Sequence, residues 1–66
     1  MQIVVNGESF ETDEGVTLTS LLARIGKSTE QVAVEHNGEI VTPDDCATLK
    51  LLPDDRLEIV HFVGGG

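Results

Sequence analysis

Two Asn-Gly pairs, each placed soon after a short apolar run, constrain the fold of this chain more than any other feature. One pair follows residues 3–5 and the other follows residues 32–35. A two-residue type I′ turn needs positive φ at both central positions, and Asn followed by Gly suits it. The sequence therefore predicts two β-hairpins, with return strands over residues 8–12 and 39–41.

An amphipathic helix is predicted between the two hairpins. Its apolar residues recur at helical spacing: Val16, Leu18, Leu21, Leu22 and Ile25. Thr17 can cap the free amide groups at the start. Gly26 stands where a left-handed residue closes a helix. We therefore expect a helix over residues 18–25, too short to persist without packing.

The rest of the chain adds a helical turn and a strand. Thr42, Pro43 and two acidic residues indicate a helix start, with one turn reaching about Ala47. A turn at residues 53–55 precedes an apolar strand predicted over 57–63. One helix must bury its stripe on one face of the sheet. The expected fold is α+β, a mixed sheet packed on one helix with the first and last strands central, which is the β-grasp (ubiquitin-like) arrangement.

Size and charge exclude several classes of function. The chain has 66 residues, with 12 acidic and 4 basic side chains and a formal charge of −8. A domain this small has little room for a deep catalytic pocket. Nucleic acids and anionic membranes require a basic face, so neither is an expected partner, whereas a basic protein surface is. No targeting or membrane-spanning run is apparent, and we expect a cytoplasmic protein.

The last predicted strand has two different faces. Side chains alternate along a strand, so Leu57 and Ile59 share one face while Val60 and Phe62 share the other. Leu57 and Ile59 are the expected core pair. Val60 and Phe62 would then be exposed on the open side of the sheet near Val63. We interpret this group as a partner-binding patch, against the alternative of scattered surface hydrophobes.

Three glycines follow the last strand. Gly64, Gly65 and Gly66 have no side chains to pack and lose much entropy when ordered. The sequence therefore predicts a β-grasp domain over residues 1–63 and a flexible tail over 64–66. Such a tail could enter a channel too narrow for any Cβ. The α-carboxylate of Gly66 would be ionised near neutral pH, and it could attack the α-phosphate of ATP.

At this point the chain resembles the ThiS family, the sulfur carriers of thiamine biosynthesis. The resemblance rests on MQIVVNGE at residues 1–8, TLTSLL at 17–22, VAVEHNGEIV at 32–41 and LEIVHFVGGG at 57–66. It covers nearly the whole chain. A terminal glycine pair alone would be a weak signal, but it gains weight from these blocks and from the chain length.

The resemblance implies a carrier that is a substrate of enzymes and not an enzyme itself. An adenylating enzyme of the ThiF type would use ATP and Mg²⁺ to activate the carboxylate of Gly66, and the carrier would bind no cofactor. A sulfur donor such as a cysteine persulfide protein would convert it to a thiocarboxylate. A thiazole synthase of the ThiG type would then take the sulfur. Phe62 matches the position where the family presents an apolar residue to its partners.

Alternative functions and residue roles remain open on the sequence alone. The chain could be a related carrier of the molybdopterin-synthase type, or a β-grasp interaction module without sulfur chemistry. Cys46 is expected to be a small packed residue, because no basic neighbour in sequence lowers its pKa. His36 and His61 lack metal-ligand spacing, so no metal site is predicted. The acidic pairs at 44–45 and 54–55 are interpreted as helix-start and turn residues.

Overall fold

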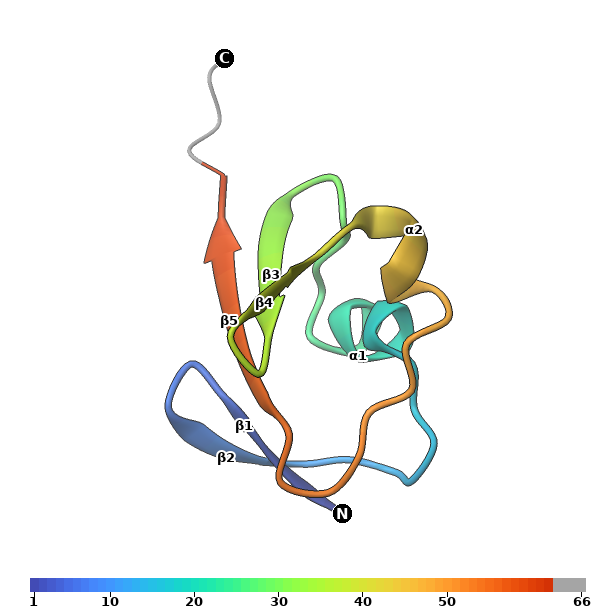
Figure 1. The fold of residues 1–66 in the computed structure, drawn as a ribbon, viewed down its shortest axis with the longest axis vertical. Helices are drawn as coiled ribbons and strands as arrows, with labels where there is room; N and C mark the ends of the chain where they lie inside the picture. The colour runs from blue at the N-terminus through green and yellow to red at the C-terminus, as the bar shows by residue number, and fades with distance from the viewer. Residues whose placement is uncertain (63–66) are drawn as a thin grey trace.

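The computed structural model describes residues 1–62, which form five strands and two helices. Figure 1 shows these elements in chain order. Their bounds are β1 Gln2–Val5, β2 Glu8–Glu11, α1 Leu18–Arg24, β3 Val32–His36, β4 Glu39–Val41, α2 Pro43–Cys46 and β5 Arg56–His61. No helix among these residues is long and apolar enough to cross a membrane.

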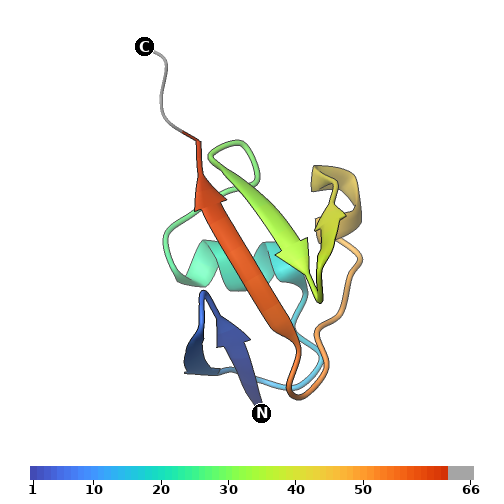
Figure 2. The same cartoon turned by 60° about the vertical axis from the view of Figure 1, so that its left-hand side comes forward.

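The five strands form one mixed sheet in the order β2-β1-β5-β3-β4. Both hairpins are antiparallel, and β5 lies between them, parallel to β1 and antiparallel to β3. Helix α1 crosses a single face of the sheet, as Figure 2 shows. The predicted α+β fold, with the first and last strands side by side near the sheet centre, is therefore confirmed.

Both Asn-Gly turns have the backbone that their sequence predicts, and both also hold β5. Asn6 and Asn37 have φ values of 50° and 49°, and the glycine after each is also at positive φ. The side-chain oxygen of Asn6 accepts a 2.7 Å hydrogen bond from the N–H of Ile59. That of Asn37 accepts a 2.8 Å bond from the N–H of Arg56. Each turn is thus joined to the central strand by its own side chain.

Helix α1 is closed at both ends by local hydrogen bonds. The hydroxyl of Thr17 accepts from the N–H of Ser20 at 3.2 Å, which confirms the predicted cap. At the other end Gly26 has φ 78° and donates to Ala23, while Lys27 donates to Leu22. These two bonds form a Schellman motif. The helix ends one residue before the predicted Ile25, which serves as its C-cap.

The core lies between α1 and the sheet. Its buried residues are Ile3, Leu18, Leu21, Leu22, Val32, Val34, Cys46, Leu51, Leu57 and Ile59. Leu57 and Ile59 confirm the predicted inward face of the last strand. That strand starts one residue earlier than predicted, at Arg56, and ends at His61. Val63, its predicted end, and the boundary between residues 63 and 64 lie outside the described residues.

Candidate functional site

The predicted sulfur-carrying residue and its neighbours lie just beyond the described part of the chain. Val63, Gly64, Gly65 and Gly66 all fall outside residues 1–62. The chain leading to them is held by β3, which pairs with β5 from Leu57 through His61. Its last described residue, Phe62, still donates a 2.8 Å backbone hydrogen bond to Gln31. Backbone hydrogen bonding therefore continues one residue past the end of β5.

An apolar patch is exposed on the open face of the sheet. Val60 is 59% exposed and pairs with Ala33 on β3. Phe62, 55% exposed, follows at the end of β5, and Ile40 on β4 is 80% exposed. We call Ala33, Ile40, Val60 and Phe62 the open-face patch. The predicted exposure of Val60 and Phe62 is confirmed, and their binding role stays a prediction.

Acidic side chains border the open-face patch. Glu35 and Glu58 are paired across β3 and β5, and both are exposed. Both lie on the same face as Val60, because Glu58 is two positions from Val60 along β5 and Glu35 is two positions from its partner Ala33 along β3. An apolar centre beside carboxylates fits a partner surface that is apolar and basic.

A buried carboxylate links the β3–β4 turn to the segment before β5. Asp55 is only 7% exposed. Its Oδ2 lies 2.8 Å from Nε2 of His36 and accepts a 2.9 Å bond from the N–H of Leu52. Its Oδ1 accepts a 3.2 Å bond from the side-chain amide of Asn37. The sequence interpretation of Asp55 as a turn residue is therefore incomplete, because it lies too far from His36 and Asn37 in sequence to show this contact.

The surroundings of Asp55 lower its pKa. Burial acts to raise it, but hydrogen bonds from His36, from the N–H of Leu52 and from Asn37, with the charge of the His36 ring, hold the pKa below its ordinary value. His36 is thus engaged with a carboxylate. Among residues 1–62, no three metal-ligating side chains gather into a group that could hold an ion.

Asp55→Asn is expected to make the free energy of unfolding fall less steeply as the pH is lowered. A carboxylate whose pKa is lower in the folded state stabilises the fold above its unfolded pKa of about 4. That contribution is lost as the pH falls through the lower folded value. Urea midpoints measured from about pH 6 down to about pH 2 should fall less steeply for the variant than for the parent. Parallel profiles for the two proteins would contradict this role of Asp55.

Cys46 is buried at 1% exposure, as the packing interpretation predicted. Its pKa is raised, first by burial and then by the charge of Asp45. The thiol is therefore kept in its protonated form, which is a poor nucleophile. The buried, protonated thiol therefore does not support a sulfur-carrying role for Cys46.

With this geometry described, the chain can be compared with known proteins. The family model described as "ThiS family" matches residues 3–66. The chain belongs to the ThiS family. The match includes the three glycines as well as the domain that precedes them.

Individual relatives of this ThiS-family chain fall into two groups by length. A thiazole synthase of Magnetococcus marinus is 42% identical over 66 residues, all of this chain but 20% of that protein. The chain thus spans about a fifth of the length of the first curated relatives it matches. The sulfur carrier protein ThiS of Bacillus subtilis is 39% identical over 64 residues, covering 94% of this chain and 96% of that one.

A solved structure matches the fold over the full length. The crystal structure of the thiamine biosynthesis protein ThiS from Geobacter metallireducens is similar with a TM-score of 0.84 and 32% identity. The match covers 100% of both chains. The β-grasp assignment of this ThiS-family member therefore rests on a neighbour of the same size.

Proposed function

We propose that this ThiS-family chain is a protein-borne sulfur carrier for thiazole formation in thiamine biosynthesis, loaded at the carboxylate of Gly66. The observation that carries the proposal is the family match, which continues through Gly66. The relative from Bacillus subtilis, similar in length, bears the name of a sulfur carrier. The fold supports this role, because β5 holds the chain in place up to Phe62.

The proposed chemistry first activates the terminal carboxylate and then replaces one of its oxygens by sulfur. The Gly66 carboxylate attacks the α-phosphate of ATP, and pyrophosphate leaves. A sulfur nucleophile then attacks the acyl carbon, and AMP leaves. Where that nucleophile is a protein persulfide, a second thiol cleaves the S–S bond and the thiocarboxylate is released. Mg²⁺ and ATP belong to the adenylating partner in this proposal, and this chain is its substrate.

The proposed partners are an adenylating enzyme of the ThiF type, a persulfide donor and a thiazole synthase of the ThiG type. Two relatives named thiazole synthase contain a segment similar to this whole chain, which supports thiazole synthase as the sulfur acceptor. The formal charge of −8 and the carboxylates beside the open-face patch favour basic docking surfaces. We place all three encounters in the cytoplasm.

The proposal is tested by intact mass. The protein is incubated with a ThiF-type enzyme, Mg²⁺-ATP and a sulfur source, and fragmentation locates any change. We expect a mass gain equal to replacing one oxygen by sulfur, located at Gly66 and absent without ATP. An unchanged mass, while a known carrier is loaded in parallel, would contradict the thiamine-type assignment. Loading by a molybdopterin-type activating enzyme instead would favour the related carrier.

A further inference from the structure

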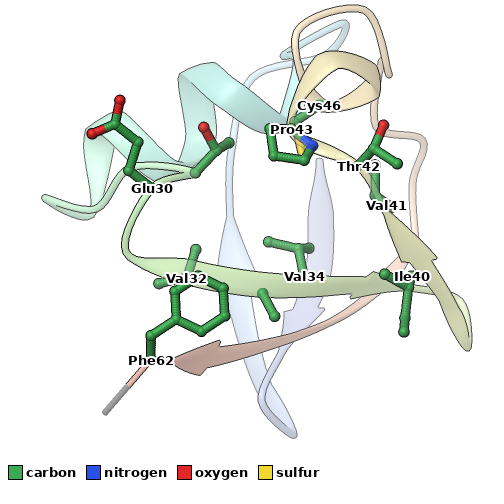
Figure 3. A pocket seen from close by; sticks show the side chains of 11 residues that line it. Glu30, Val32, Val34, Ile40, Val41, Thr42, Pro43, Cys46 and Phe62 are labelled. Carbon is green, nitrogen blue, oxygen red and sulfur yellow. The ribbon is translucent and has the colours of Figure 1, made fainter. Parts of the chain in front are cut away.

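An apolar groove lies between β3 and α2, on the opposite side of β3 from β5. Its volume is about 550 Å³, within the range of small-ligand and side-chain pockets. Val32, Val34 and Cys46 contribute to its lining. Figure 3 places the ring of Phe62 beside Val32 at one end and Ile40 at the other.

An unused stretch of the edge of β3 lines the groove. Strand β4 pairs with β3 only from Val34 onward. Alternate residues along β3 direct their backbone groups to opposite edges of the strand. The C=O of Gln31 accepts from Phe62 and the N–H of Asn37 donates to Arg56, so these odd-numbered residues face β5. Val32 therefore directs its N–H and C=O toward the groove. Neither group has a backbone partner within residues 1–62.

Proline explains why β4 leaves this edge open. Continuing the β3–β4 register would place Pro43 opposite Val32, and Pro has no N–H to donate. The chain instead starts α2 there, with Thr42 as its cap. Val32 is only 4% exposed, so its unpaired backbone groups lie in an apolar setting where a hydrogen-bonding partner stabilises them.

The charges around the groove select its occupant. Glu30 lines the groove itself, and Asp44 and Asp45 lie in the first turn of α2, which forms one wall. No Lys or Arg is among the residues that line it. A second copy of this chain, with a formal charge of −8, would meet like charge. A partner segment with basic residues would meet opposite charge at both sides.

We propose that this groove binds an extended segment of a partner protein in which apolar side chains are flanked by basic residues. The segment adds its backbone to the free edge at Val32, and its apolar side chains enter the groove. This mode is strand addition to an open sheet edge, with a pocket for selectivity. The groove shares Ala33, Ile40 and Phe62 with the open-face patch but does not include Val60, and it extends from there to the buried residues Val32, Val34 and Cys46. The inference does not depend on sulfur transfer.

Titration of the ¹⁵N-labelled protein with an acetylated and amidated peptide, KLVLK, tests the proposal. The amide of Val32 is expected to move downfield, because it gains a hydrogen bond. The matched peptide ELVLE should bind more weakly, since its carboxylates meet Glu30. Glu30→Lys should weaken KLVLK binding about three- to tenfold, through lost attraction and added repulsion. Glu14→Lys, the same charge change at an exposed position outside the groove, should leave the affinity unchanged.

Three results would overturn the groove assignment. One is the absence of any shift at Val32 when the peptide is present at millimolar concentration. Another is a set of shifts confined to Val60 and Glu58 on the open face, with none at Val32, Val34 or Cys46. The third is an equal loss of affinity in Glu30→Lys and Glu14→Lys, which would mean attraction to overall charge alone. The same spectra report whether each variant is folded, and sulfur loading of Glu30→Lys is measured separately.

Discussion

Deletion of Gly66 is expected to abolish sulfur loading while leaving the stability of the domain unchanged. The shortened chain still ends in a glycine carboxylate, but that group falls short by one residue, about 3.3–3.6 Å. A displacement of about 1 Å can cost a reaction about 100-fold. The loading rate should therefore fall by at least that factor. The buried side chains of the described residues all lie at or before Ile59, so the fold does not need Gly66.

Two further variants complete this experiment: one distinguishes the length of the tail from the width of the channel that it enters, and the other is a control. Gly66→Ala keeps the length of the tail but adds a methyl group, and it should load poorly if the channel admits no Cβ. Glu14→Gln changes an exposed loop residue and should load like the parent. Intact mass over time gives the loading rate, and a urea midpoint gives the stability. A Gly66 deletion that loads at the parental rate would exclude Gly66 as the sulfur-carrying residue.

Truncation of Leu21 should leave the domain largely unfolded. Leu21 has 0% exposure on the inner face of α1. Replacing a buried Leu by Ala costs about 2–5 kcal/mol. A domain of this size, without a disulfide, has only about 3–5 kcal/mol of stability from its core. The two quantities are comparable, so Leu21→Ala should shift much of the population to the unfolded state at room temperature.

Leu52→Ala provides the matched control for this truncation. Leu52 is 64% exposed, and its hydrogen bond to Asp55 comes from its backbone N–H. The same chemical change at an exposed site should alter the free energy of unfolding by no more than about 0.5 kcal/mol. Urea titrations followed by circular dichroism compare the two variants. Equal midpoints for both would refute the assignment of Leu21 to the core.

Local sequence patterns were sufficient for most elements of this fold. Each Asn-Gly pair needs only its own backbone to turn, and Thr17 caps α1 through a residue three positions away. Alternation along the last strand likewise predicted that Ile59 would be buried and Val60 exposed. These features depend on neighbours in sequence, so their physical causes can be read from a single segment.

Contacts between distant segments could not be predicted in the same way. Asn6 bonds to Ile59 across 53 positions, and His36 meets Asp55 across 19. Such contacts depend on strand order and register, which no local motif specifies. The groove escaped prediction for the same reason. Pro43 correctly indicated a helix start, but only the register of β4 against β3 shows that it leaves Val32 unpaired.

The functional assignment also has one part that follows from local sequence and one part that does not. Alternation along β5 and the residue that follows it predicted the exposure of Val60 and Phe62, and the structure confirms it. The roles of Gly64, Gly65 and Gly66 remain predictions that rest on family membership. Their chemistry depends on another protein's active site, and no property of this chain's own packing reports on that site.

The central position of β5 has a consequence for how the chain matures on the ribosome. Among the seven described elements, strand β1 is synthesised first, yet its parallel neighbour β5 is synthesised last. Until β5 emerges, the two hairpins have no strand between them and α1 has no complete sheet to cover. Such non-local pairing delays folding until the distant segments meet. An enzyme that recognises the finished sheet would thereby select chains already synthesised through His61, and would ignore truncated products.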